Sequence, residues 1–232
     1  MARKRQPLTQ FTWVVTSPSP RKRLCRKLLN GNVNDGKRPI SLLYIISKVL
    51  ERCVLNRIND RLEDLIANCQ PGFRSGHSCV TNLLETLDHI GAILDRAVQV
   101  DCVYLDASKA FDKVRHDILM EKLRDAGFGG NLLTWFRAYL CDRRQRVTVL
   151  GTTSRDLPVT SGVPQGSILG PALFLLYVNK LPDSILNSKV AMFADDPKVY
   201  KAVMSEDDGA SLQQDLDNLS SGSISSGLAF ND

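Results

Sequence analysis

Two adjacent carboxylates, those of Asp195 and Asp196, follow a short apolar run late in the sequence. The run covers 190–193 and has the composition of a short strand. A second apolar run, 100–105, ends in its own acid, Asp106. Carboxylates grouped in an apolar setting repel one another and lose solvation, so a bound divalent cation is the usual compensation. Hard oxygen ligands suit Mg²⁺, and three carboxylates can hold two such ions for an in-line phosphoryl displacement.

The rest of the sequence alternates between helical and extended patterns. Apolar residues recur at three- and four-residue steps over 42–65, which predicts a long amphipathic helix, and Pro71 and Gly72 break the chain after it. A helix that ends near residue 126 has Gly127 in a suitable C-terminal capping position. Further helices are predicted over 83–94, 116–126, 132–140, 167–179 and 212–219, and strands over 100–106, 146–150, 157–159, 190–193 and 198–200. These elements predict an α+β fold.

Several sequence blocks stand in a definite order along the chain. They are RPISLL and SKVLE within 38–51, QPGFRSG at 70–76, VYLDASKAFD at 103–112, SGVPQGSILGP at 161–171 and FADD at 193–196. With these blocks in this order, the chain resembles the reverse transcriptases of non-LTR retrotransposons over most of its length. The resemblance implies a right-hand polymerase fold of the α+β class. Helical fingers are expected over about 38–99, and an antiparallel palm sheet backed by helices over about 100–232.

The resemblance gives the three acids a catalytic role. Asp106, Asp195 and Asp196 are expected to hold two Mg²⁺ ions, for which Mn²⁺ is a substitute, and Ala107 is expected to add a backbone carbonyl to one ion. A tight turn between two strands explains why two of the acids are adjacent, because the turn projects them toward the strand that carries Asp106. The implied activity is RNA-directed DNA polymerisation at a primer 3′-hydroxyl. The implied partners are an RNA template, a DNA primer and deoxynucleoside triphosphates.

Four more residues are expected at the nucleotide by the same resemblance. Phe111 would lie beneath the sugar, where a bulky ring clashes with a 2′-hydroxyl, and Arg74 would donate two parallel hydrogen bonds to the triphosphate. Gly166 would permit close backbone approach, and Gln165 would contact the nucleotide or the template. Ordinary structural roles stay open beside these: core packing for Phe111, a surface position for Arg74 and helix capping for Gln165 and Gly166.

The sequence departs from the family pattern at two positions. Pro197 follows the acidic turn where relatives usually have a strand former, and it removes a ladder hydrogen bond, so the turn is expected to shift. Lys180 stands where relatives usually carry Asp. Relatives also continue into a primer grip and a thumb, neither of which is recognised in this sequence. A second interpretation therefore stays open, in which the chain is a decayed or domesticated copy that at most binds RNA.

The net charge of +5 is unevenly distributed. Residues 1–38 hold ten Lys or Arg and one acid, whereas 202–232 hold acids and no Lys or Arg. We expect 1–37 to be mostly disordered, either as a phosphate-binding arm or nuclear address or as a solvated tail. No apolar run approaches the ~20 residues that span a bilayer. The six Cys show no CxxC pair, which favours reduced thiols and an intracellular protein, nuclear or cytoplasmic.

Overall fold

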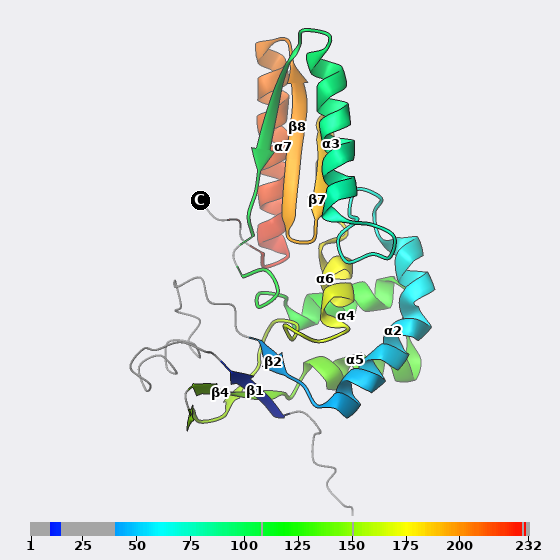
Figure 1. Cartoon of the computed structure of the whole chain (residues 1–232), viewed down its shortest axis with the longest axis vertical. Helices are drawn as coiled ribbons and strands as arrows, with labels where there is room; N and C mark the ends of the chain where they lie inside the picture. The colour runs from blue at the N-terminus through cyan, green and yellow to red at the C-terminus, as the bar shows by residue number, and fades with distance from the viewer. Residues whose placement is uncertain (1–9, 15–39, 108, 150, 229, 231–232) are drawn as a thin grey trace, which may run out of the picture.

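The computed structural model describes residues 10–14, 40–107, 109–149, 151–228 and 230. Figure 1 shows a sheet flanked by two long helices at one end of the molecule and the remaining helices, with a second sheet of short strands, at the other. The basic segment 1–37 lies outside the described residues, except for the strand Gln10–Val14.

The first sheet has three antiparallel strands and carries the three acids at one end. They are β3 (Gln99–Tyr104), β7 (Lys189–Phe193) and β8 (Asp196–Val203), in the order β3-β8-β7. Helix α3 (Cys79–Leu94) contacts β3 and β7, and helix α7 (Glu206–Ser225) contacts β8 (Figure 1). This is the sheet that the apolar runs and the acidic turn predict.

The other helices pack around a common core. They are α2 (Ile45–Leu65), α4 (His116–Asp125), α5 (Gly130–Leu140) and α6 (Gly170–Val178), followed by a short 3₁₀ turn at Pro182–Ser184. Helix α6 is apolar on every side and its last six residues are all buried, as a helix at the centre of a core should be. It contacts both α4 and α2, so it connects these two helices through the core.

A second sheet combines strands from distant parts of the chain. Strand β1 (Gln10–Val14) pairs antiparallel with β2 (Ser41–Leu42) and parallel with β4 (Arg144–Val149). Strand β4 also pairs with β5 (Thr152–Thr153) and β6 (Leu157–Pro158). The hairpin around β4 is the predicted one. Strand β1 lies within the segment expected to be mostly disordered, and its β-branched and aromatic residues have the composition of a strand.

Element boundaries differ from the sequence-based expectations where local chemistry decides them. Helix α6 begins three residues later than predicted, with Pro171 at its start, where a missing N–H costs nothing. Helix α7 begins earlier, because Ser205 and Asp208 form a reciprocal capping box at its N-terminus. Strand β8 starts at Asp196 and runs through Pro197.

Two helices carry apolar side chains that the described residues leave exposed. On α2 the predicted apolar face includes Ile46 and Val49, which are 84 % and 58 % exposed, and on α3 it includes Leu84 and Leu87, 60 % and 53 % exposed. The helices were predicted correctly, but these stripes are not part of the core. Among the described residues, no helix has both the length and the apolar content that crossing a bilayer requires.

Candidate active site

The three acids lie at the same end of the three-stranded sheet, and the register of the strands places them there. Tyr104 of β3 pairs with Lys198 of β8, and the N–H of Leu105 donates to the carbonyl of Pro197 at 3.0 Å. Asp106 follows two residues after the end of β3, and continuing this register brings it level with Asp196 at the start of β8. Asp106 and Asp196 are exposed to solvent.

The turn between β7 and β8 is a two-residue hairpin loop. Phe193 pairs with Asp196, so Ala194 and Asp195 form the loop. Ala194 has a φ of 57°, as the first loop residue of a type II′ turn requires, although Gly usually occupies this position. The tight turn that the sequence predicted between the two strands is therefore present, and the direction in which it projects the acids stays a prediction.

Pro197 fits this hairpin although β8 is the central strand of the sheet. It pairs with Met192 on β7, and its carbonyl still accepts from Leu105 on the β3 side. Strand β3 ends at Tyr104, so no residue of that strand lies opposite the missing N–H of Pro197. The ladder therefore loses a bond only at its end, and the pairing of Phe193 with Asp196 is retained.

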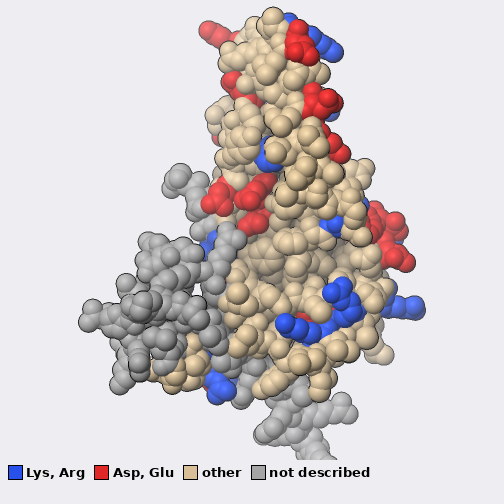
Figure 2. All heavy atoms as spheres, in the orientation of Figure 1, with Lys and Arg blue, Asp and Glu red and all other residues tan. Residues whose placement is uncertain are grey.

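The carboxylates of the three acids are of the chemical kind that binds divalent cations, but in this structure they are not arranged as a complete set of metal ligands. Their carboxylate oxygens are the donors that Mg²⁺ and Mn²⁺ take in proteins. Across the residues that the structure describes, no group of three His, Cys, Asp or Glu side chains converges closely enough to hold a metal ion. Figure 2 shows acidic side chains gathered in the middle of one face, at the level of the β7–β8 turn in Figure 1.

Ala107 follows Asp106 and is anchored by the end of the chain. It forms an isolated antiparallel bridge with Phe230 and is 7 % exposed. The bridge fixes the backbone just beyond the first acid. The metal-carbonyl role expected for Ala107 stays a prediction.

Phe111 lies in an aromatic cluster. Its ring stacks on Phe174 of α6, with centroids 4.4 Å apart and planes at 13°, and meets the edge of Phe73 at 6.1 Å. Its carbonyl accepts from the N–H of Val163 at 2.9 Å. A Cβ on Gly162 would lie only 3.0 Å from the backbone of Asp112, so a glycine lets the two segments approach closely. The block at 161–171 is therefore fastened directly to the block that carries Phe111.

Gln165 and Gly166 occupy the loop before α6, and β2 backs this loop. The N–H of Ser41 donates to the carbonyl of Gln165 at 2.9 Å. Gly166 has a φ of 87°, a conformation that favours glycine, and a Cβ there would lie 3.2 Å from Cγ2 of Ile40, which would have to move slightly. The side chain of Gln165 is half-buried, which leaves its proposed nucleotide contact as a prediction.

A buried carboxylate, which sequence reasoning did not single out, secures the same loop. Glu51 of α2 is 1 % exposed and accepts from the N–H groups of Ile168 at 2.8 Å and Leu169 at 3.3 Å. Negative charge is favourable there because these amides lie at the N-terminal end of α6. Burial lowers the pKa of nearby Arg143 to about 10, and the ring of Tyr139 and the Glu51 carboxylate oppose that change.

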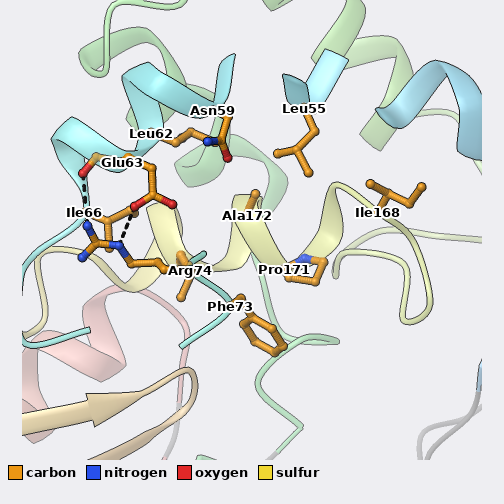
Figure 3. Close-up of a pocket in the computed structure, with 11 residues that line it drawn as sticks. Leu55, Asn59, Leu62, Glu63, Ile66, Phe73, Arg74, Ile168, Pro171 and Ala172 are labelled. Carbon is orange, nitrogen blue, oxygen red and sulfur yellow. Dashed lines mark hydrogen bonds and ion pairs between the residues drawn. The ribbon is translucent and has the colours of Figure 1, made fainter. Parts of the chain in front are cut away.

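Arg74 is bound by the C-terminal end of α2. Its Nε donates to Oε2 of Glu63 at 2.7 Å, and its side chain is only 11 % exposed. Figure 3 shows the guanidinium turned toward Glu63 while the ring of Phe73 points the other way. Both residues line a pocket of about 80 Å³, whose other walls include Leu55, Ile168, Pro171 and Ala172. The triphosphate contact expected for Arg74 stays a prediction.

A loop that precedes α3 covers the outer edge of β7. The N–H of Met192 donates to the carbonyl of Cys69 at 2.8 Å. Gln70, fully buried beside it, hydrogen-bonds both backbone groups of Ala194. The sequence placed Gln70 in a recognisable block but offered no signal for this contact, because the partner lies in a block far along the chain.

Two titratable side chains near this region have shifted pKa values. Burial lowers the pKa of His116, whose Nε2 lies 2.9 Å from the carbonyl of Gly162. Burial raises the pKa of Asp112, and the charge of Lys109 partly offsets that effect. Both belong to the segment that packs against the 161–171 block.

The chain matches the family described as reverse transcriptase (RNA-dependent DNA polymerase) over residues 27–232. It is 37 % identical over 188 residues to the Drosophila melanogaster "Probable RNA-directed DNA polymerase from transposon X-element", covering 77 % of this chain and 20 % of that protein. It is 31 % identical over 195 residues to the RNA-directed DNA polymerase from mobile element jockey of the same fly, covering 79 % of this chain and 21 % of that protein. The chain thus spans about a fifth of the length of these relatives.

Comparison with solved structures supports the fold even though the sequence identity is low. An apo telomerase of Candida tropicalis, truncated from its C-terminal domain, superposes with a TM-score of 0.57 at 13 % identity, over 80 % of this chain and 39 % of that one. This confirms the predicted α+β fingers and palm. The family match and the two fly relatives show that the chain belongs to the reverse transcriptase family, among the polymerases of non-LTR retrotransposons.

Proposed function

We propose that this chain is the fingers and palm part of an RNA-directed DNA polymerase. It would extend the 3′-hydroxyl of a DNA primer with deoxynucleoside triphosphates, copying an RNA template. The observation that carries the proposal is the register that brings Asp106 level with Asp196, beside the turn that presents Asp195. Solvent exposure of Asp106 and Asp196 leaves that end of the sheet open to a substrate.

Divalent metal use comes with membership of this polymerase family. We propose Mg²⁺ as the ion, with two ions held by Asp106, Asp195 and Asp196, and Mn²⁺ as a substitute. When bound, the ions would supply charge stabilisation for the transferred phosphoryl group and lower the pKa of the attacking hydroxyl. The contribution of the chain itself is to bring the three carboxylates to one sheet end.

Phe111 is proposed as the residue that selects the sugar. Its ring is half-buried and fixed on one side by Phe174, so it is braced against displacement by a ribose 2′-hydroxyl. Gly166 and Gln165 lie in the loop fastened to the same segment, where they would contact the nucleotide or the template. Arg74 would reach the triphosphate only by exchanging the carboxylate of Glu63 for phosphate oxygens.

The proposed cellular setting is the nucleus or the cytoplasm. It is supported by the cysteines, because Cys53, Cys69, Cys79, Cys102 and Cys141 are all free of disulfides among the described residues. Reduced cysteines are typical of intracellular proteins. Fractionation of cells that express a tagged full chain would test it.

Primer extension with matched carboxylate variants tests the proposal. The chain is assayed alone and in place of the corresponding segment of the X-element polymerase, on a primed RNA template with Mg²⁺ and deoxynucleotides. Asp106→Asn and Asp195→Asn are expected to reduce extension by about a hundredfold or more, because each removes a charge while preserving side-chain shape. Asp217→Asn, on the exposed side of α7, is the control and should extend normally. Chimeras whose extension survives both active-site changes, or that never extend, would refute the proposal.

A further inference from the structure

We infer that Gln70 is a positioning residue, whose carboxamide holds the turn that carries Asp195 in its working conformation. Gln70 acts on the acid through the backbone of Ala194 and contacts no substrate itself. The inference rests on the proposed function, because it assigns Gln70 to the metal-binding turn.

The contacts between Gln70 and the turn are short and buried. Oε1 accepts from the N–H of Ala194 at 2.8 Å and from the N–H of Gly72 at 3.2 Å. Nε2 donates to the carbonyl of Ala194 at 2.9 Å. The side chain is 1 % exposed, so water does not compete for these bonds. One amide therefore satisfies both backbone groups of the residue that immediately precedes Asp195.

Ala194 needs such support because its backbone is in the left-handed region. Its φ of 57° is uncommon for a residue with a side chain, and such a conformation persists only where surrounding contacts hold it. A turn of this type usually has glycine at that position. Gln70 binds the two backbone groups of Ala194 itself, so it holds the strained residue rather than a neighbour.

The loop that carries Gln70 is itself fixed to the strand beneath the turn. Cys69 accepts from the N–H of Met192 at 2.8 Å, and Nδ2 of Asn82 reaches the carbonyl of Met192 at 3.5 Å. Gly72 passes so close that a Cβ would lie 2.6 Å from the nitrogen of Ala194. The loop that carries Gln70 thus packs directly against the turn and is itself bound to β7. We call the two hydrogen bonds between Gln70 and Ala194 the clamp.

Positioning matters for this turn because ligand and reaction geometry tolerate little displacement. Removing a group that hydrogen-bonds to a metal ligand and orients it commonly lowers metal affinity or activity ten- to a hundredfold. Rotation about the bonds of Ala194 would swing Asp195 relative to Asp106 and Asp196. A side chain that fixes Ala194 therefore fixes the spacing of the acids.

The chain offers a matched control in Asn179. Its Oδ1 accepts from the N–H of Ala67 at 2.8 Å and its Nδ2 donates to the carbonyl of Leu65 at 2.8 Å. This amide makes the same pair of bonds to backbone, but at the end of α2 and not at the acidic turn. Loss of Asn179 should loosen the fold without displacing Asp195.

Hydrogen exchange at a single amide tests the clamp without any need for catalysis. The full 232-residue chain is labelled with ¹⁵N-alanine, and exchange of the Ala194 N–H is compared in the wild type, Gln70→Met and Asn179→Ala. Gln70→Met keeps the length of the side chain but removes its polar atoms. Exchange at Ala194 should accelerate about tenfold or more in Gln70→Met, relative to the change at other core amides, and not in Asn179→Ala.

Mn²⁺ binding, followed by electron paramagnetic resonance on the same variants, tests the positioning role. Wild-type binding should depend on Asp195, as shown by its loss in Asp195→Asn. The affinity should fall about tenfold or more in Gln70→Met and stay unchanged in Asn179→Ala. Gln70→Asn keeps an amide but shortens its reach by one methylene, so it should show the same losses if Gln70→Met does not fold.

The outcomes separate the inference from the proposed function. Unchanged Ala194 exchange in the folded Gln70 variants would overturn the clamp. Unchanged Mn²⁺ affinity in those variants, with wild-type binding still dependent on Asp195, would overturn the positioning role. Wild-type Mn²⁺ binding that is indifferent to Asp195→Asn would refute the proposed metal site and the positioning role that rests on it, and the exchange data would then show whether the clamp itself exists.

Discussion

The ring of Phe111 lies flat against the ring of Phe174, with centroids 4.4 Å apart and planes at 13°. Phe174 is completely buried in α6, so this stack joins the proposed sugar-selecting residue to the centre of the core. The two interpretations of Phe111 that the sequence left open, core packing and sugar selection, are therefore compatible in one side chain.

Phe111→Val should relax sugar selection and lower stability at the same time. Removing the ring removes the clash with a 2′-hydroxyl, so the ratio of ribonucleotide to deoxynucleotide incorporation should rise about tenfold or more. The lost packing should cost about 2–4 kcal/mol in the free energy of unfolding. Phe136→Leu is the control, because this fully buried ring of α5 packs on Phe128 and Trp135, so its loss should lower stability with the incorporation ratio unchanged. An incorporation ratio that stays the same in Phe111→Val would leave Phe111 as a core residue only.

Gly72→Ala should displace the acidic turn. A Cβ at this position would lie 2.6 Å from the nitrogen of Ala194, closer than real side chains approach, so the backbone must move. We expect a cost of about 1–3 kcal/mol in denaturant unfolding and a marked loss of primer extension. Gly91→Ala on α3 meets nothing within 4 Å and should be neutral or slightly stabilising. Equal behaviour of the two variants would contradict the close contact.

Arg74 and Glu63 can be separated by substituting each partner in turn. If Arg74 contacts the triphosphate, Arg74→Ala should raise the KM for deoxynucleotides about tenfold or more, because a charge-assisted bond to phosphate is lost. Glu63→Gln removes only the ion pair, so its KM should not rise. Steady-state extension kinetics check both variants. An identical rise for both would assign Arg74 to the ion pair with Glu63 alone.

Folding stability should fall as pH drops below about 6.5, the ordinary pKa of His. Burial lowers the pKa of His116 in the folded chain, Arg143 lowers it further, and the Gly162 carbonyl and Asp117 oppose the shift. The unfolded chain therefore takes up a proton at a higher pH than the folded one, so acid favours unfolding over that interval. Above pH 6.5 both states are neutral at this side chain and the effect is absent.

Denaturant unfolding of His116→Gln between pH 7.5 and 5 measures this contribution. The Gln amide can still donate to the carbonyl of Gly162, but it does not titrate, so part of the pH dependence should disappear. His77→Gln, at an exposed position, is the control and should keep the wild-type slope. The same slope in the wild type and His116→Gln would show that His116 does not cause the loss of stability.

Local patterns in the sequence were enough to locate the acids and most of the elements around them. The runs before Asp106 and Asp195 form β3 and β7, which lie on either side of β8 in one sheet, and Gly127, with a φ of 87°, ends α4 as expected. Pro197 leaves the register of the hairpin intact, and its expected effect on the position of the acids stays a prediction. A single sequence cannot show that β3 has already ended opposite that proline.

The contacts that secure the site were not predictable from the same patterns. Glu51 sits in an amphipathic helix, where a charged residue is expected to face water, yet its partners are backbone amides 117 and 118 residues further along. Gln70 meets Ala194 across 124 residues. The spacing of apolar residues indicates which face of a helix or strand is apolar. The burial of Glu51 and Gln70 depends instead on segments from distant parts of the chain that pack against them. The apolar face of α2 that includes Ile46 lies exposed, because the spacing of apolar residues does not show whether another segment packs against that face.

The pairing of β1 with β4 has a consequence for synthesis. Gln10 to Val14 leave the ribosome more than a hundred residues ahead of their parallel partners, from Arg144 to Thr148. Until then one edge of β1 has no strand to bind, and such edges are sites of mispairing. Pairings between strands far apart along the chain also form slowly. The completion of this small sheet therefore sets the earliest moment at which the nascent domain is safe from aggregation through that strand.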